Sequence, residues 1–524
     1  MVSKAKTHSH VPWLAIAAGI FFLSSLILFN TSNLYISPDE TANAYFSNLF
    51  AQTGSFSTAI DQLALTFGDR IHPRSAVSVN GILKPGSFLG LPLVYGIFTA
   101  VLGGWILWIL TPLAVIVAAF AWRELMARFV QKNIATISAI LFLFHPAIWY
   151  YSARSLMHNA LFVSLLIIGI HFLVNKKNYD VYGGLLIALA IMTRTSEIWW
   201  VLALLGAGLM FACKRIGRRR LILILTGLVL GAVIMLGANA VTYGSPFTTG
   251  YTVGQQIQTV ELVASDALDA VGLFPFGLHP RDAWGNVSNY GVSMFWWLSI
   301  LALLGVFVFT TEKKKRRERI AYTAAFVLIS AWLSLLYGSW EIHDNPDWTQ
   351  VTMANSYVRY WLPMYIMSTT FIAAAIVWIS KRGRTNLAKN LIIGTLMIAV
   401  IGLNVHATFI QGQDGLLSVR DTLAESSAVQ KSVLSLTEDD ALIVVDRADK
   451  LFFPHRRVMY PLRSDETYNA LPLLVQNVPV YYYGISFPDE DFNYLNDSRL
   501  ASMGLQIELV ESFTLESLYR IYPQ

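Results

Sequence analysis

Long apolar runs separated by short charged segments dominate the first 410 residues of the chain. A helix that crosses a lipid bilayer needs about 20 mostly apolar residues, and runs near that length recur along this part of the sequence. They predict about eleven membrane-spanning helices, at 11–30, 105–121, 134–151, 160–174, 181–194, 197–213, 221–241, 291–311, 320–338, 358–380 and 391–410. A further apolar run at 88–103 contains several glycines and a proline. This composition favours a re-entrant or juxtamembrane element over a full span.

Clusters of basic residues between these runs predict the orientation of the chain, because lysine and arginine are enriched in cytoplasmic loops. Five clusters occur, at 123–132, 176–177, 214–220, 313–319 and 381–384. If all five lie inside together with the N-terminus, an even number of spans must separate each neighbouring pair, and the eleven-span arrangement satisfies this condition. The longer connecting segments are then expected outside, at 31–87, 242–290 and 339–357, and so is the C-terminal tail.

The tail, residues 411–524, differs in composition from the rest of the chain. It has 17 acidic and 9 basic residues, whereas the inner loops are basic. Short apolar runs with turn residues between them predict strands at 442–445, 478–483, 506–510 and 517–522. We therefore predict an all-α polytopic membrane module at 1–410, with its N-terminus inside, followed by a small extracytoplasmic α/β domain at 411–524.

The overall composition agrees with a multi-pass membrane protein. Of 524 residues, 55% are hydrophobic and only 14% are charged, and the mean hydropathy is +0.51. Soluble domains usually contain about 25% charged residues. The first run is too long for the core of a signal peptide and has no clear small-residue cleavage site, so we expect it to be retained. The single cysteine, Cys213, allows no disulfide within the chain.

Two features of the first outside loop have chemical potential. Asp39 and Glu40 follow Pro38 a few residues beyond the first span, and proline followed by acidic residues is typical of the first turn of a helix. Lys84 precedes Pro85 where the loop returns to the membrane. Each has a structural interpretation, since the carboxylates could simply cap a helix and the lysine could extend its ammonium from the interface to water. The residues alone leave both interpretations open.

Taken together, these motifs resemble the first loop of the GT-C superfamily of membrane glycosyltransferases. The match consists of Tyr-Ile-Ser-Pro-Asp-Glu-Thr from Tyr35 to Thr41, followed by Lys84-Pro85. The nearest similar enzymes are bacterial and family-39-like, and they include aminoarabinose transferases and protein mannosyltransferases. Similar segments continue in the same order at Tyr151–Asn159, Met192–Arg194, Asn239–Tyr251 and Ser356–Pro363. Every one lies at an expected outside boundary.

The resemblance implies an inverting transferase in a prokaryotic cell membrane that takes sugar from a polyprenyl-phosphate-linked donor. The acceptor would be a hydroxyl of a lipid, glycan or protein, and no nucleic acid is involved. Asp39 would be the general base, and Glu40 would orient the acceptor or a metal ion. The cations expected to stabilise the leaving phosphate are Lys84, Arg154, Arg194 and Arg359. Candidate polar or acceptor contacts are His158, Asn159, Tyr360 and His343.

One position departs from the family's pattern. Family members often have a second acidic residue in the second outside loop, where this chain has Asn159. Asparagine cannot serve as a charged metal ligand. No cofactor is therefore certain, and a divalent cation, if one binds, would be held by Asp39, Glu40 and His158.

Two other classes of membrane protein are alternatives to a glycosyltransferase. A transporter or flippase would favour charged residues near the middle of spans and an internal repeat. Here nearly all charges lie at the ends of spans, and no repeat is visible. A polymerase or ligase of lipid-linked glycans would have its main outside loop late in the chain. In this chain the acidic motif is in the first loop, which favours the glycosyltransferase.

Overall fold

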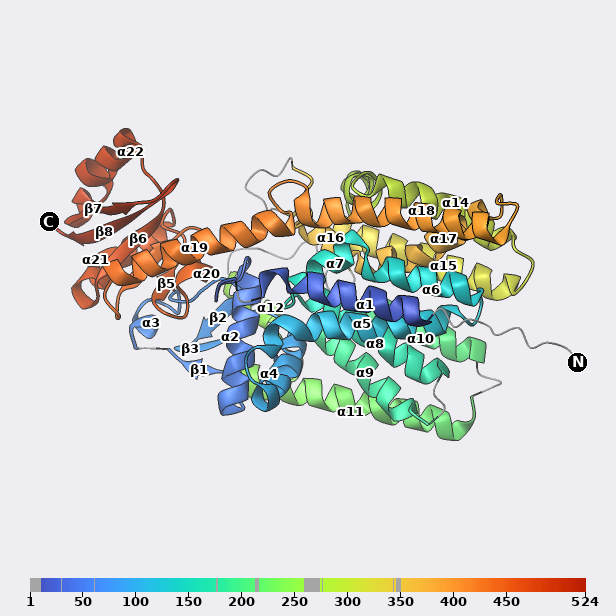
Figure 1. Cartoon of the computed structure of the whole chain (residues 1–524). Coiled ribbons are helices and arrows are strands. Elements are labelled where there is room, and N and C mark those ends of the chain that lie inside the picture. Colours follow the sequence, from blue (N-terminus) through green and yellow to red (C-terminus); the bar gives the residue numbers. More distant parts are fainter. Residues whose placement is uncertain are drawn as a thin grey trace, which may run out of the picture. The chain divides into compact units, whose positions relative to one another are not determined.

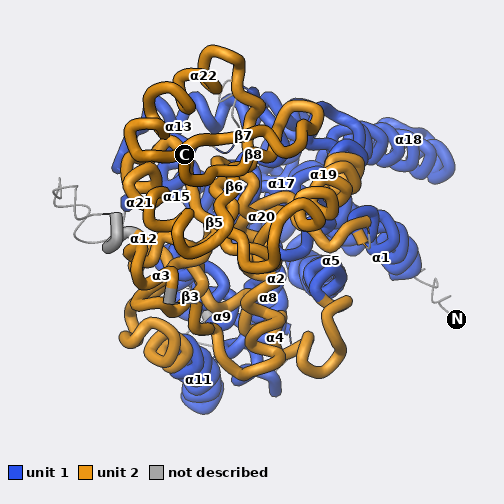
Figure 2. Tube along the Cα trace, turned by 90° about the vertical axis from the view of Figure 1, so that its left-hand side faces the viewer, with its two compact units in different colours: residues 1–28, 107–235, 262–418 blue, residues 29–106, 236–261, 419–524 orange. Residues whose placement is uncertain are grey.

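The computed structural model describes residues 11–29, 31–60, 62–175, 178–212, 216–258, 274–275, 277–342, 344 and 350–524. The chain forms two compact units, which Figure 2 shows in different colours. Unit 1 comprises Met1–Leu28, Leu107–Met235 and Leu262–Ser418, and unit 2 comprises Phe29–Ile106, Leu236–Glu261 and Val419–Gln524. The predicted domain boundary near residue 410 falls close to the division at Ser418, but unit 2 also contains the first outside loop.

Unit 1 is built from helices. They are α1 (Val11–Ser25), η1 (Leu26–Leu28), α5 (Ile106–Met126), α6 (Lys132–Leu143), α7 (Pro146–Ala153), α8 (His158–Asn175), α9 (Asp180–Thr193), η2 (Thr195–Glu197), α10 (Ile198–Ala212), α11 (Arg218–Tyr243, up to Met235), α13 (Pro280–Asn286), η4 (Val287–Ser293), α14 (Trp296–Thr311), α15 (Arg316–Gly338), α16 (Ser356–Tyr360), α17 (Leu362–Ser380), α18 (Asn386–Val405) and η5 (His406–Ile410). Helix α17 is buried along most of its length, and it packs against α6, α14, α15 and α18 (Figure 1).

Seven helices among the described residues are long and apolar enough to cross a membrane alone. These seven are Val11–Leu28, Ile106–Met126, His158–Asn175, Arg218–Tyr243, Arg316–Gly338, Leu362–Ser380 and Asn386–Ile410. Three further pairs pass only when joined: α6 with α7, α9 with α10, and the segment Pro280–Ser293 with α14. They are bent by 48°, 117° and 93° respectively. Counting each pair as one span gives up to ten spans.

The predicted count of about eleven spans is therefore not confirmed. The difference lies at 181–194 and 197–213, which the hydrophobic pattern predicts as two spans. Helices α9 and α10 contain 14 and 15 residues, fewer than the roughly 20 that a span needs. Each of the other nine predicted spans coincides with a long helix or with a bent pair. The inside and outside assignment of the loops stays a prediction.

The first sheet of unit 2 lies within the first outside loop. Strands β1 (Thr58–Ala59), β2 (Ala76–Val79) and β3 (Ile82–Pro85) are antiparallel in the order β1-β3-β2. The turn between β2 and β3 consists of Asn80 and Gly81, both with positive φ, as a two-residue hairpin turn requires. The accompanying helices are α2 (Pro38–Thr53), α3 (Gln62–Thr66), α4 (Gly90–Leu102) and α12 (Gly250–Gln258). Helix α4 is the apolar run predicted not to span, and at 13 residues it is too short to do so.

The second sheet of unit 2 confirms the predicted small α/β fold of the tail. Its strands are β4 (Leu442–Val445), β5 (Arg457–Met459), β6 (Val480–Ile485), β7 (Leu505–Ser512) and β8 (Glu516–Pro523), in the order β5-β4-β6-β8-β7. Strand β4 is parallel to β5 and β6, and the remaining pairs are antiparallel. The helices are α19 (Leu416–Leu436), α20 (Asp449–Phe452), α21 (Asp465–Asn477) and α22 (Asp489–Tyr494), with η6 (Leu495–Arg499) and η7 (Ala501–Met503).

The first loop and the tail share one hydrophobic core inside unit 2. Ala64, Phe67 and Ile71 of the loop are buried in the same cluster as Leu442 and Leu471 of the tail. Because core residues of both segments lose their solvent exposure together, the two segments stabilise one another. The acidic motif of the first loop is therefore positioned by a body that includes the C-terminal sheet.

Candidate active site

Helix α2 begins at Pro38, as predicted, and a capping box closes its first turn. The Ser37 hydroxyl accepts the Glu40 backbone N–H at 3.3 Å, and the Glu40 carboxylate accepts the Ser37 backbone N–H at 2.9 Å. Glu40 is only 2% exposed. The capping interpretation that the sequence left open is therefore confirmed for Glu40.

Asp39 makes a different contact. The hydroxyl of Ser75 donates a hydrogen bond to Oδ1 of Asp39 at 2.6 Å. Ser75 directly precedes β2, and its carbonyl accepts the backbone N–H of Gly86, just beyond β3, at 3.0 Å. Asp39 is half-buried, so its carboxylate is held at the end of the first sheet without being sealed off from solvent.

Lys84 lies on β3, directly opposite Val77 of β2, and is half-buried. Pro85 pairs with Ala76 across the two strands. The next residues along the chain, Gly86 after β3 and Ser75 before β2, therefore lie opposite each other. The hairpin thus brings Lys84 to the same end of the sheet as the Ser75 residue that binds Asp39. Asp39 and Lys84, which are 45 residues apart in the sequence, are therefore both located at this end of the sheet.

The Gly-Ser-Pro…Thr-Gly-Tyr segment packs on the same turn. The Tyr243 hydroxyl donates to the carbonyls of Pro85 at 2.8 Å and Ser87 at 3.2 Å. Gly250, the first residue of α12, approaches so closely that an added Cβ would lie 2.3 Å from the Pro85 carbonyl oxygen. Only glycine permits this approach. Three of the segments that carry the family resemblance therefore meet within unit 2.

Helix α20 of the tail anchors the first loop next to Asp39 and next to Ser75. Asp449 is fully buried and accepts hydrogen bonds from the backbone N–H of Arg74 at 2.8 Å and from its Nε at 2.7 Å. The ammonium of Lys450 donates to the carbonyl of Ile36. Hydrogen bonds to charged groups are stronger than neutral ones, so these contacts fix the backbone near both Asp39 and Ser75.

Two titratable groups beside the first sheet have shifted pKa values. Burial lowers the pKa of His72, against the opposing influence of the Pro73 carbonyl and the Asp449 carboxylate. Burial acts to raise the pKa of Asp69, but hydrogen bonds from the Ser78 hydroxyl and from two backbone N–H groups outweigh it and hold that pKa below its usual value.

In unit 1, Arg154 and Arg359 come together around Tyr151. Arg154 ends α7, is 4% exposed, and has its guanidinium carbon 5.9 Å from the centre of the Tyr151 ring. Arg359 on α16 donates to the Ser356 hydroxyl at 2.8 Å and contacts the sulfur of Met157 at 3.0 Å. The Tyr151 hydroxyl interacts electrostatically with both guanidinium groups.

Arg194 joins this cluster through Tyr360. Its guanidinium lies 4.7 Å from the centre of the Tyr360 ring, and that of Arg359 lies 5.3 Å from the same ring. Arg194 also donates to the Tyr337 hydroxyl at 2.8 Å and to Glu197 at 3.1 Å. All three predicted arginines thus gather in unit 1, and the charge of Arg194 is balanced by a buried carboxylate.

The remaining candidate residues have diverse positions. His158 and Asn159 are buried in the first turn of α8, directly after Met157, and Tyr360 stacks on Tyr337 with ring centres 4.4 Å apart. His343 lies outside the described residues. Within the part of the chain that the structure describes, no group of three or more His, Cys, Asp or Glu side chains is arranged to hold a metal ion. The divalent cation stays a prediction.

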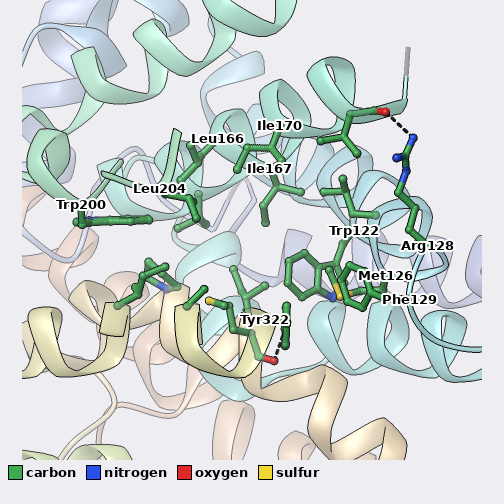
Figure 3. Close-up of a pocket in the computed structure, with 18 residues that line it drawn as sticks. Trp122, Met126, Arg128, Phe129, Leu166, Ile167, Ile170, Trp200, Leu204 and Tyr322 are labelled. Atoms are coloured by element: carbon green, nitrogen blue, oxygen red, sulfur yellow. Dashed lines mark hydrogen bonds between the residues drawn. The ribbon is translucent and has the colours of Figure 1, made fainter. Parts of the chain in front are cut away.

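An apolar cavity of about 290 Å³ runs between α8 and α15 in unit 1 (Figure 3). Its walls also include residues of α5, α10 and α17, and Figure 3 shows Trp200 at one end and Arg128 at the other. The indole N–H of Trp200 donates to Glu197, the partner of Arg194. One end of the cavity therefore adjoins the arginine cluster.

The sequence matches no protein-family model, and no curated protein is significantly similar. Solved structures are similar in fold. ArnT from Cupriavidus metallidurans bound to undecaprenyl phosphate has a TM-score of 0.59 and 12% identity, over 98% of each chain. The archaeal oligosaccharyltransferase AglB from Archaeoglobus fulgidus, in complex with an inhibitory peptide and a dolichol-phosphate, has a TM-score of 0.51 and 13% identity, over 96% of this chain and 71% of that chain.

The chain has the GT-C fold. The fold that the motifs of the first loop predict is therefore confirmed over nearly the whole chain. The GT-C fold and the apolar helices make this a multi-pass membrane protein. At 12% identity the likeness establishes architecture, so the roles of individual residues must be argued from the geometry of this chain.

Proposed function

We propose that the protein is an inverting glycosyltransferase that moves a sugar from a polyprenyl-phosphate donor to an acceptor hydroxyl. The observation that carries this proposal is the cluster of Arg154, Arg194 and Arg359 next to one end of an apolar cavity. A polyprenyl-phosphate sugar combines an anionic phosphate with a long apolar tail. A cationic cluster beside an apolar cavity suits both parts of such a molecule.

The electrostatics favour an anion at this cluster. Three guanidinium groups gather around Tyr151 and Tyr360, and Glu197 forms an ion pair with that of Arg194. Arginine is well suited to the task because its planar fork can bind two phosphate oxygens at once. The negative charge that develops on the phosphate as it leaves would be stabilised by groups already in place.

Asp39 supplies the base. As the acceptor oxygen attacks the anomeric carbon, its proton passes to the Asp39 carboxylate. The bond between that carbon and the phosphate oxygen breaks, and the phosphate leaves with the electron pair. Attack from the side opposite the phosphate inverts the configuration at the anomeric carbon. Glu40 is engaged in the capping box, so the proposal assigns the proton transfer to Asp39 alone.

Lys84 is assigned to a donor phosphate on the resemblance of the first loop to the GT-C glycosyltransferases. The acceptor is a hydroxyl of a lipid, glycan or protein, and we place the enzyme in a prokaryotic plasma membrane with the tail outside. This topology follows from the basic clusters of the sequence, and the GT-C fold supports the transferase class.

Lipid analysis of the purified protein tests the donor class. We expect polyprenyl phosphate to co-purify with the full-length protein in mild detergent and to be identified by mass spectrometry. Arg154→Gln combined with Arg359→Gln should lower its amount at least tenfold, because two charge-assisted contacts to the phosphate are lost. Arg128→Gln, at the other end of the cavity, is the matched control and should retain the lipid. Equal lipid content in both variants would contradict the proposal.

A further inference from the structure

Ser75 contacts the proposed base from a backbone conformation that L-amino acids rarely adopt. Its hydroxyl donates to Asp39 at 2.6 Å while its own φ is +61°. Left-handed conformations are unfavourable for residues with a Cβ, and they persist only where the surrounding structure enforces them. Such positions cluster at functional sites.

Gly86 and Gly250 enforce the conformation of Ser75. An added Cβ on Gly86 would lie 2.9 Å from the carbonyl carbon and oxygen of Ser75, so the two backbones are in direct contact. The Gly86 N–H also donates to that carbonyl oxygen. Gly250 packs against the same turn, at Pro85, Gly86 and Ser87. Ser75 is thus clamped by the segment that bears Lys84.

We propose that Ser75 is a positioning residue that holds the Asp39 carboxylate in the orientation from which it takes the acceptor proton. This inference rests on the proposed function, in which Asp39 is the base. A carboxylate at the start of a helix can rotate about its side-chain bonds, and a short hydrogen bond to one oxygen fixes that rotation. A base held in a single orientation transfers a proton more efficiently than one that samples several.

The same hairpin contains a matched serine–aspartate pair. The Ser78 hydroxyl donates to Asp69, also at 2.6 Å. Asp69 additionally accepts the backbone N–H groups of Asn80 and Gly81, both at 2.7 Å, so this pair closes the hairpin turn. Ser78 and Ser75 therefore make bonds of equal length to carboxylates, but only Ser75 binds the proposed base.

Three variants of the full-length protein in lipid nanodiscs separate positioning from stability. Ser75→Gly removes the hydroxyl and relieves the backbone strain, because glycine tolerates positive φ. Ser75→Asn restores a donor in a residue that also tolerates this conformation. Ser78→Ala removes the matched bond. The assay uses undecaprenyl-phosphate-linked sugars and, as acceptor, a total membrane extract that contains lipids, glycans and proteins, with the unfolding temperature measured in parallel.

We expect Ser75→Gly to keep the wild-type unfolding temperature while kcat falls about 10- to 100-fold. This rate ratio corresponds to the free energy of one hydrogen bond to a charged group. The KM for the donor should change less than twofold. Ser75→Asn should recover part of the lost kcat. Ser78→Ala should lower the unfolding temperature and leave kcat within twofold of wild type. Partial rescue with an unchanged KM is a pattern that general destabilisation does not produce.

Asp39→Asn distinguishes failure of this inference from failure of the proposed function. If Asp39→Asn is inactive and Ser75→Gly has wild-type kcat, the positioning role is wrong and the base assignment stands. If Asp39→Asn is fully active, the base assignment is wrong and so is the role of Ser75, although the protein is still a glycosyltransferase. If the wild-type protein transfers no sugar, the proposed function itself is wrong.

Discussion

Replacing Gly250 with alanine tests whether the contact between α12 and the Lys84 turn positions the site. The added Cβ would lie 2.3 Å from the Pro85 carbonyl oxygen and 2.4 Å from the carbonyl carbon of Gly86. Ordinary contact begins at 3.4 Å, so these backbones must separate by about 1.1 Å. Neither neighbour is a flexible side chain that could rotate away, and the turn that carries Ser75 and Lys84 must move.

The expected magnitudes follow from this displacement. Overpacking costs about 1–3 kcal/mol, partly offset by the gain of about 0.5–1 kcal/mol from placing alanine in a helix. The unfolding temperature should fall by about 2–4 °C. Activity should fall further, because a displacement of about 1 Å in a catalytic group can cost 100-fold in rate. The unfolding temperature and the initial rate of sugar transfer are both measured in nanodiscs.

Gly254→Ala is the matched control on the same helix. A Cβ added at Gly254 meets its nearest atom, in Val77, at 3.8 Å, so it fits without any shift. This variant should unfold at or slightly above the wild-type temperature and transfer sugar at the wild-type rate. If Gly250→Ala behaves like Gly254→Ala in both assays, the positioning role of the α12 contact is refuted.

Two predictions concern how the first loop is held to helix α20 of the tail and how the stability of unit 2 depends on pH. Arg74→Met should destabilise unit 2 by about 2–3 kcal/mol, because it leaves Asp449 buried without its guanidinium partner. The double variant Arg74→Met/Asp449→Asn should unfold at a higher temperature than Arg74→Met alone, and strictly additive losses would argue against the pair. His72, whose pKa burial lowers, is neutral in the folded state at neutral pH. Unfolded histidine binds a proton below about pH 6.5, so stability should be complete above that pH and decline as pH falls toward the lowered pKa. Unfolding temperatures between pH 7.5 and 5 should show this decline in the wild type and a shallower one in His72→Gln, and identical slopes would exclude His72 as the cause.

Local signals in the sequence predict the first turn of α2 correctly. Pro38 and the acidic residues after it indicate a helix start, and the capping box between Ser37 and Glu40 spans three residues. The Asn80-Gly81 pair is an equally strong hairpin signal, and reading it would have revealed the first sheet. Strand β5 has only three residues and leaves no detectable alternation. Short-range chemistry is therefore readable, provided the element is long enough to show a pattern.

Contacts between distant segments are not readable in the same way. Asp39 and Ser75 are separated by 36 residues, and Arg74 and Asp449 by 375. No periodicity along a single chain specifies which of many serines or aspartates will meet. The hydrophobic pattern also cannot distinguish two short spans from one helix pair bent by 117°, because both give two apolar runs. The arginine cluster was predicted as a set of boundary cations, but its assembly around Tyr151 and Tyr360 required the structure.

The most direct test of the central claim is the transfer reaction of the wild-type protein beside Asp39→Asn. Both are reconstituted in nanodiscs with undecaprenyl-phosphate-linked sugars and a total membrane extract that contains lipids, glycans and proteins, and the products are followed by mass spectrometry. The Asp39 account predicts that the wild type releases undecaprenyl phosphate and glycosylates an acceptor. It also predicts that Asp39→Asn unfolds at the wild-type temperature but loses at least 100-fold in rate. Transfer at the wild-type rate by Asp39→Asn would contradict it.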